Sequence, residues 1–293
     1  MEFAGKPVIR DLSFDVRRGE TFGFLGSNGS GKTTTIRALL GIYVPTAGVL
    51  HIGGRPFTPE SGIMLGYLPE ERGLYKKESV IDVMAYFGRL KGLSRSAAMS
   101  WSLAYLDRVA MTDRAKVRLD KLSSGEQQKV QLGVTIMNEP ELLILDEPTK
   151  GFDPVNRRLL MQIIEEQRTA GATVLMVTHQ MEEVERLCDR IILLKNGVAE
   201  AYGTVAEVQS QYGATLIRVL CDEPLPVSDH YEIVKSSPGE VDLSPLGHAD
   251  EASILRELVE AGIAVRGFNP VKPSLDDIFV KVYGQQDSIG ESR

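Results

Sequence analysis

The feature that most constrains the fold is a strand, a glycine-rich turn and a helix in immediate succession near the start of the chain. Residues 21–25 (TFGFL) form a short apolar run that is typical of a buried strand. The segment GSNGSGKT (26–33) follows at once, and the next residues, TTIRALL, favour a helix. Because glycine enters backbone conformations that other residues avoid, this turn can curl tightly. The succession predicts an α/β fold with a binding site at the turn.

The turn matches the phosphate-loop pattern G-x-x-x-x-G-K-[ST]. Its N–H groups can converge on phosphate oxygens, and the helix start adds partial positive charge. Lys32 is expected to bridge the β- and γ-phosphates of a nucleotide, and the Thr33 hydroxyl to ligate Mg²⁺. A glycine-rich turn without a ligand is the alternative. The expected nucleotide-binding residues of this loop are Ser27, Asn28, Gly29, Ser30, Gly31, Lys32, Thr33 and Thr34.

The rest of residues 1–212 alternates apolar runs with helical stretches, which predicts a mainly parallel sheet with an antiparallel part. Segments 141–146 (ELLILD) and 172–178 (ATVLMVT) are almost continuously apolar, as in strands covered on both faces. In residues 12–16 (LSFDV) the apolar side chains alternate with polar ones, which predicts a half-buried strand. Asn196-Gly197 predicts a tight hairpin turn.

Two further regions differ in character from this alternation. Residues 71–120 contain two or three helical pieces and no convincing strand, so we interpret them as a helical insertion. Residues 213–285 predict a small α+β C-terminal domain, with a strand at 263–268 (IAVRGF). The last residues, 286–293, are expected to form a frayed tail.

An acidic pair and a histidine follow two of the predicted strands. Asp146 and Glu147 are costly at the end of a buried strand unless a cation or a water network receives them. Ligands of open α/β sheets bind at that end of the strands. We expect Asp146 to hold Mg²⁺ through water and Glu147 to orient the attacking water, although the pair could instead cap the next turn. His179 is expected to contact the γ-phosphate and brace Glu147, although a lone histidine is more often structural.

The segment LSSGEQQKV (122–130) gives these motifs a common context. By itself, the spacing of Ser123 and Glu126 predicts a helix capping box. The phosphate loop, LSSGE, LLILDE and the strand-end histidine occur in that order, and together they resemble an ATP-binding cassette (ABC) ATPase. In that family, the LSGGQ-type signature closes over the γ-phosphate held by a second cassette. The resemblance implies that Ser123 and the Gly125 N–H contact ATP across a dimer, while Glu126 preserves the cap.

The same resemblance assigns roles to three more residues. Glu70 falls where the family usually has Gln, which links Mg²⁺ and water to the helical insertion, so it is an expected metal and nucleotide contact. Its charge adds repulsion near the γ-phosphate. Asp153 lies in the loop that passes between the two sites, and Phe3 lies where an aromatic residue stacks on adenine, although packing is the alternative for Phe3. Ser124 replaces a usual Gly, and a left-handed backbone there would cost about 1 kcal/mol.

Charge and hydropathy limit the partners. The formal net charge of -7 argues against a general nucleic-acid binder. No apolar run approaches the roughly 20 residues that span a bilayer. The resemblance implies ATP and Mg²⁺ as cofactors and a second ABC ATPase subunit, expected to form a homodimer, with a heterodimer of cassettes as the alternative. Because no run can span the bilayer, it also implies a separate transmembrane permease. It also implies a cytoplasmic location at the inner face of the cell membrane.

The segment PSLDDIF (273–279) is similar to the C-terminal extension of bacterial exporter-type ATPases, including sodium-efflux and drug-export proteins. This similarity implies export, while a stabilising appendage with a Ser274/Asp277 cap is the alternative. Two other functions stay open at this point. One is a soluble ABC ATPase that acts on ribosomes, DNA or cofactor assembly, and the other is a nucleotide-sensing module with little turnover.

Overall fold

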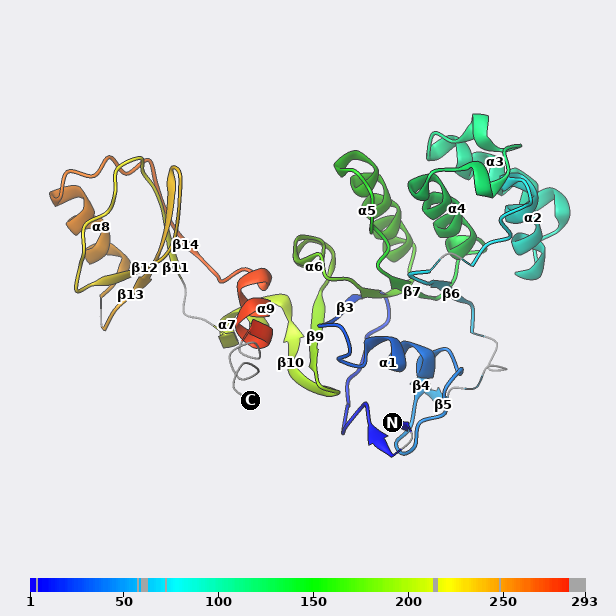
Figure 1. Cartoon of the computed structure of the whole chain (residues 1–293), viewed down its shortest axis with the longest axis horizontal. Coiled ribbons are helices and arrows are strands. Elements are labelled where there is room, and N and C mark those ends of the chain that lie inside the picture. Colours follow the sequence, from blue (N-terminus) through cyan, green and yellow to red (C-terminus); the bar gives the residue numbers. More distant parts are fainter. Residues whose placement is uncertain are drawn as a thin grey trace, which may run out of the picture. The chain divides into compact units, whose positions relative to one another are not determined.

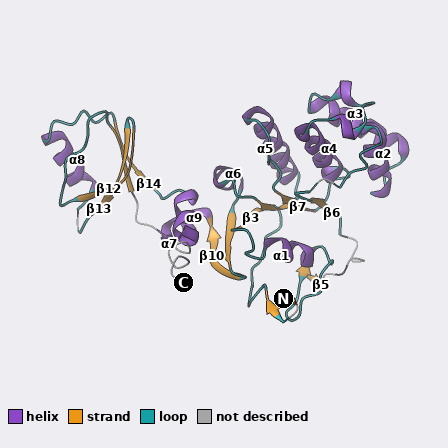
Figure 2. Ribbon diagram, viewed as in Figure 1, coloured by secondary structure: helices purple, strands orange, loops and turns teal. Residues whose placement is uncertain are grey.

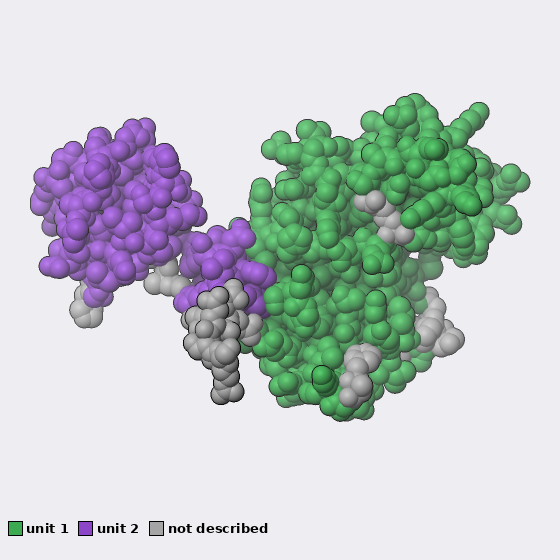
Figure 3. Space-filling view, in the orientation of Figure 1, with its two compact units in different colours: residues 1–205 green, residues 206–293 purple. Residues whose placement is uncertain are grey.

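The computed structural model describes residues 1–3, 5–56, 58, 63–71, 73–212, 216–247 and 249–284, except the side chain of Phe3. The chain divides into two compact units, Met1–Val205 and Ala206–Arg293, which Figure 3 shows in green and purple. Each unit is described by itself. The expected tail at 286–293 lies outside the described residues.

The first unit is built on a six-stranded sheet with the order β10-β9-β3-β8-β7-β6 (Figures 1 and 2). Its strands are β3 (Thr21–Gly26), β6 (Leu65–Leu68), β7 (Leu142–Asp146), β8 (Thr173–Val177), β9 (Arg190–Lys195) and β10 (Val198–Thr204). All neighbouring pairs are parallel except β9 and β10, which are antiparallel. The predicted mainly parallel sheet is therefore confirmed.

Helices cover both faces of this sheet (Figure 1). Helix α1 (Lys32–Leu39) lies on one face, and α4 (Ser124–Ile136), α5 (Pro154–Thr169) and α6 (Met181–Leu187) lie on the other. On the α1 face, Ile36 belongs to a buried cluster with strand residues, namely Phe22, Phe24, Ile144, Leu175, Val177, Ile192 and Leu194. Burial on both faces explains why these strands are almost continuously apolar.

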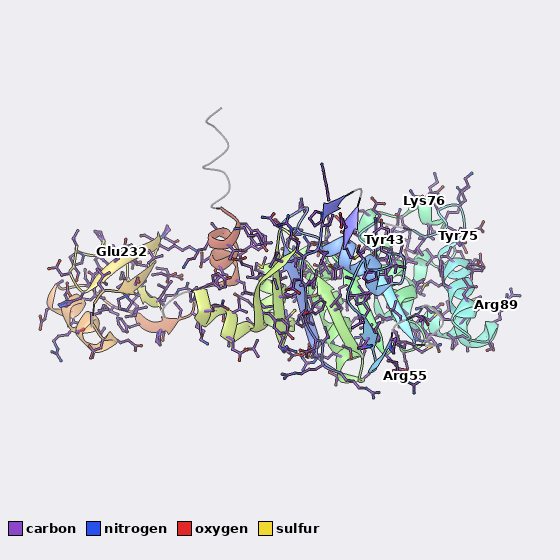
Figure 4. All side chains as sticks on the ribbon, turned by 90° about the horizontal axis from the view of Figure 1, so that it is seen from below. Tyr43, Arg55, Tyr75, Lys76, Arg89 and Glu232 are labelled. Carbon is purple, nitrogen blue, oxygen red and sulfur yellow. The ribbon has the colours of Figure 1, made fainter. Side chains whose placement is uncertain are left out.

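The helical insertion contains α2 (Val80–Leu90) and α3 (Arg95–Arg108), followed by short 3₁₀ turns at Thr112–Arg114 and Leu119–Lys121. Both helices have serine N-caps, because the hydroxyls of Ser79 and Ser94 accept backbone N–H groups of the first turn. Tyr75, Lys76 and Arg89 lie on the surface of this part (Figure 4).

Helix α4 packs closely on α3 through a glycine. The Tyr105 side chain is buried, and its hydroxyl donates to the Lys129 carbonyl oxygen at 2.7 Å. A Cβ at Gly133 would overlap the Tyr105 ring.

We expect Gly133→Ala to lower the free energy of unfolding by about 1–3 kcal/mol, because the buried Tyr105 ring has to move. Calorimetry should show this loss, whereas Gly125→Ala, where a Cβ would lie 3.4 Å from Phe152, should not lower the stability. Equal melting temperatures for the two variants would contradict this packing.

The prediction of a strand at residues 12–16 is wrong. No strand is assigned there, although Leu12, Phe14 and Val16 are half-buried and pack against the core. The segment is held by side chains instead, because Arg190 pairs with Asp15 at 3.0 Å and the Tyr202 hydroxyl bonds to the Asp15 carboxylate at 2.6 Å. These bonds lower the pKa of Asp15 to about 2. The burial pattern of a strand therefore occurs here without a neighbouring backbone ladder.

Short antiparallel ladders complete the first unit. They are β1 (Glu2–Phe3) with β2 (Lys6–Pro7), and β4 (His51–Ile52) with β5 (Arg55–Pro56). The hairpin between β9 and β10 turns at Asn196-Gly197, as predicted, with φ values of 50° and 79°. Gly197 is required there because a Cβ would overlap the carbonyl of Val8.

The second unit contains a four-stranded antiparallel sheet with the order β12-β13-β11-β14. Its elements are α7 (Val205–Tyr212, whose first residue belongs to the first unit), β11 (Leu216–Leu220), β12 (Tyr231–Ser237), β13 (Glu240–Pro245), α8 (Glu251–Glu260), β14 (Gly267–Val271) and α9 (Leu275–Tyr283). Ile254 and Leu258 of α8 join the core of this sheet. The strand predicted at 263–268 is observed as β14, several residues later.

None of the helices in the described part of the chain combines the length and the apolar character that a bilayer crossing requires.

Candidate functional site

The glycine-rich turn between β3 and α1 forms the first side of the site. Gly31 is the N-cap of α1 with φ 109°, a left-handed conformation that favours glycine. Lys32 folds back over the turn, because its Nζ donates to the carbonyl oxygens of Gly26 at 2.6 Å and Ser27 at 3.0 Å. Burial lowers the pKa of Lys32, while the nearby carboxylates of Glu147, Asp146 and Glu70 raise it. A lysine is thus positioned among carboxylates at a helix start, where a phosphate can bind.

Hydroxyl groups of the same turn are placed for a ligand. The Ser30 side chain is buried, and its Oγ has no hydrogen-bond partner among the described residues. A buried hydroxyl without a partner is costly, so an incoming phosphate oxygen would satisfy it. Thr33 lies exposed in the first turn of α1.

Asp146 and Glu147 stand at the carboxyl end of β7, and only 7% and 9% of their surfaces are exposed. Burial, followed by the charges of Glu70 and Glu147, raises the pKa of Asp146 to about 6. A cation bound at this carboxylate would offset the unfavourable charge. Asp146 therefore has the environment expected of a cation ligand.

Glu147 and His179 are brought together from adjacent strands. The Glu147 N–H donates to the Val177 carbonyl oxygen at 2.7 Å, and its backbone has φ 51°, which is uncommon for a residue other than glycine. His179 Nδ1 lies 2.8 Å from Glu147 Oε1. The other carboxylate oxygen, Oε2, is buried and has no partner in the described part of the molecule. One oxygen of Glu147 is thus held by His179, while the other is left with an unsatisfied capacity to accept a hydrogen bond.

The helix start at residues 122–126 has the predicted capping box. The Ser123 hydroxyl accepts the Glu126 N–H at 3.2 Å, and the Glu126 carboxylate accepts the Ser123 N–H at 2.8 Å. Ser123 and Ser124 are exposed. The strain considered for Ser124 is absent, because Ser124 is the first residue of α4 and has no positive φ.

The other residues assigned by resemblance are placed as follows. Asp153 is the N-cap of α5, and its carboxylate accepts the N–H groups of Val155 at 2.9 Å and Asn156 at 3.0 Å. The Phe3 backbone is part of β1, and its side chain lies outside the described residues. Asp153 therefore has a structural role within its own helix.

Several polar contacts around the site were not predicted. Lys150 Nζ lies 2.6 Å from Glu70 Oε1, and the Thr149 hydroxyl lies 2.5 Å from the buried carboxylate of Glu183. The amide of Gln131 donates to the backbone on both sides of Glu70. For the pair of Lys150 and Glu70, the sequence shows only a lysine close to Asp146 and Glu147. That position does not indicate which carboxylate the lysine pairs with.

Comparisons with known proteins agree with this geometry. Residues 9–150 match the model of the ABC transporter family, and residues 203–283 match that of the C-terminal domain of DrrA1-3-like ATP-binding proteins. The ABC transporter ATP-binding protein YhaQ of Bacillus subtilis is 34% identical, over 96% of this chain and 95% of its own. The chain belongs to the ABC transporter ATP-binding family.

Two more matches are to an export ATP-binding protein and to a solved structure. The Nod factor export ATP-binding protein I of Cupriavidus pinatubonensis is 32% identical, over 97% of this chain and 89% of its own. A solved ATP-binding subunit of an ABC transporter has a TM-score of 0.66 at 30% identity, covering 72% of this chain and 89% of that one. This ABC protein binds ATP and hydrolyses it, as the phosphate loop and the acidic pair indicate.

The residues present also fit Mg²⁺. Among the described residues, no group of three or more His, Cys, Asp or Glu side chains could hold a metal by itself. Mg²⁺ is commonly bound through one or two carboxylates together with substrate phosphates. Asp146 and Thr33 supply a carboxylate and a hydroxyl of this kind, so they fit a metal that arrives with ATP.

Proposed function

We propose that this ABC protein works as a dimer of two cassettes around two ATP molecules and drives export through a separate membrane permease. The observation that carries the proposal is the exposed helix start at Ser123. In the described part of the chain, no hydrogen bond or ion pair joins residues 122–126 to the phosphate loop of the same molecule. The first N–H groups of a helix need partners, and the γ-phosphate on a second copy would supply one.

In this proposal, each active centre has residues from two molecules. The phosphate loop holds the triphosphate, with Lys32 moving from its own loop carbonyls to the β- and γ-phosphates. Glu147 accepts a proton from the attacking water, and His179 keeps the carboxylate oriented and contacts the γ-phosphate. Thr33 and Asp146, with Glu70 nearby, would hold Mg²⁺, and the bound metal would neutralise phosphate charge. Ser123 and Gly125 of the second copy close the site, and Asp153 lies in the loop between the two centres.

The surface of the helical insertion supports a contact with a permease. Tyr75 and Tyr86 are 55% and 45% exposed, and their rings meet edge to face at 5.6 Å. Phe87 packs beside both rings. Exposed aromatic clusters are enriched at protein interfaces, and this one follows the Glu70 loop in the chain. A movement of the Glu70 loop on ATP binding would therefore be passed to a permease bound at this cluster. Binding to the permease would also hold the protein at the inner face of the membrane.

Export is favoured by a match to an export protein that covers 97% of this chain. The match to an export protein includes the second unit, which belongs to a family of C-terminal domains found in ATP-binding proteins. The acidic net charge of -7 disfavours an ATPase that acts on nucleic acid.

Co-purification from membranes tests this function. We expect the chain, co-expressed with a hydrophobic multispan protein from a neighbouring reading frame, to be retained with that protein after detergent extraction. Changing Tyr75 and Tyr86 to Glu together should reduce retention by about tenfold, because desolvating two charges opposes the contact. Lys77→Glu, a charge change at another exposed position of the insertion, is the control. A chain that hydrolyses ATP but never associates with the membrane protein would favour a soluble ATPase.

A further inference from the structure

The Glu70–Lys150 ion pair joins two loops at the same edge of the sheet. Glu70 follows β6 and Lys150 follows β7, and these strands are parallel neighbours. The distance between Lys150 Nζ and Glu70 Oε1 is 2.6 Å, with 58% and 47% of the two side chains exposed. The pair therefore lies at the carboxyl ends of the strands, beside the acidic pair.

The backbone at both ends of the ion pair is held by α4. Gln131 Nε2 donates to the carbonyl oxygens of Pro69 and Glu71 at 3.4 Å, so it fixes the residues on either side of Glu70. Gln128 Nε2 donates to the Pro148 carbonyl oxygen at 3.4 Å. The Lys150 N–H donates to the Glu147 carbonyl oxygen at 3.2 Å. The lysine and the carboxylate thus face each other from anchored loops, which reduces the entropy lost on pairing.

The charges around this edge make Lys150 important for an anionic ligand. Glu70, Asp146 and Glu147 act on Lys32, and the same carboxylates act on Lys150. With both lysines present, these five groups carry one excess negative charge. Without Lys150 they carry two, in a place where ATP brings several more. Charges a few ångströms apart near a protein surface interact appreciably even after screening.

We propose that Lys150 is a positioning residue that neutralises Glu70, so that a carboxylate can stand beside the γ-phosphate of bound ATP. This inference rests on the proposed function of the site. Lys150 acts through Glu70 and not by contact with the nucleotide. Its removal should therefore weaken ATP binding only as long as Glu70 keeps its charge.

A double-mutant cycle tests the coupling. ATPase assays and equilibrium binding of a fluorescent ATP analogue, each with and without Mg²⁺, would compare the wild type, Glu70→Gln, Lys150→Met and the double variant. We expect Lys150→Met to raise the KM and the Kd about tenfold in low salt, and less in high salt because of screening. The double variant should stay within about twofold of Glu70→Gln. Lys150→Arg, which keeps the charge, should resemble the wild type.

Lys77→Met is the matched control for lost positive charge, because Lys77 is exposed on the helical insertion. It should leave KM and Kd unchanged. An unaltered Kd in Lys150→Met would overturn the inference, as would a tenfold defect that persists in the double variant. If all four proteins bind the analogue in the expected order but none hydrolyses ATP, the proposed function fails while the role of Lys150 stands.

Discussion

Replacing Glu147 with Gln is expected to reduce steady-state ATP turnover by about 100- to 10,000-fold, the loss typical for a positioned general base. Glutamine has nearly the same shape but cannot accept the proton of the attacking water. The geometry should survive, because the Glu147 backbone is held by its 2.7 Å bond to the Val177 carbonyl oxygen. His179 should keep a partner in the amide oxygen of the glutamine.

The same substitution should trap the ATP-bound dimer. Phosphate release would measure the turnover, and light scattering after gel filtration with ATP would measure the dimer. Nucleotide affinity should change little, since Lys32 and the phosphate loop are untouched. Glu182→Gln, an exposed carboxylate in α6, is the control and should behave as the wild type. Unchanged turnover in Glu147→Gln would remove Glu147 from its catalytic role, and a wild type without turnover would favour a nucleotide sensor.

Local sequence signals were sufficient for the parts of the fold in which neighbouring residues decide the conformation. The strand before the phosphate loop, the Asn196-Gly197 turn and the capping box at Ser123 were all predicted and are observed. In each case a short run of neighbouring residues determines the local backbone conformation. The turn, for example, needs left-handed backbone at consecutive positions, which Asn and Gly adopt readily.

One strand prediction was wrong and another placed its strand several residues too early, for a shared physical reason. Alternating apolar residues show that one side of a segment is buried, but they do not show that another backbone lies alongside. At residues 12–16 the apolar side chains pack on the core while Asp15 bonds to side chains of β9 and β10. Ile263 and Val265 likewise pack on the core of the second unit before the ladder begins at Gly267.

Positions in the candidate site could be predicted where a single strand end sets them, but not where distant loops meet. The apolar run before Asp146 and Glu147 placed both residues at a strand end, as observed. Glu70 and Lys150 are 80 residues apart, and their pairing depends on β6 lying beside β7 in the sheet. The sequence shows the extra negative charge at Glu70 but gives no indication of its partner.

Gly125→Ala is expected to reduce ATP turnover by about 100-fold, comparable to the loss of a backbone donor that stabilises transition-state charge. The fold should accept the change. Gly125 lies in the first turn of α4 without a positive φ, and a Cβ there would lie 3.4 Å from the Phe152 ring. Alanine also favours a helix over glycine by up to about 1 kcal/mol. A loss of activity would therefore reflect a lost contact with a second copy and not a less stable fold.

Gly125→Ala separates the two parts of the proposed site, which are the phosphate loop of one copy and the start of α4 of the other. The phosphate loop of a Gly125→Ala molecule is intact, so a fluorescent ATP analogue should bind the monomer with wild-type affinity. Closure over the phosphate of a second copy should fail, because a methyl group at the helix start would crowd the approach of the γ-phosphate to the Gly125 N–H. Combining Gly125→Ala with Glu147→Gln should therefore abolish the ATP-bound dimer that Glu147→Gln alone accumulates. A double variant that still dimerises with ATP would show that the start of α4 does not close the site.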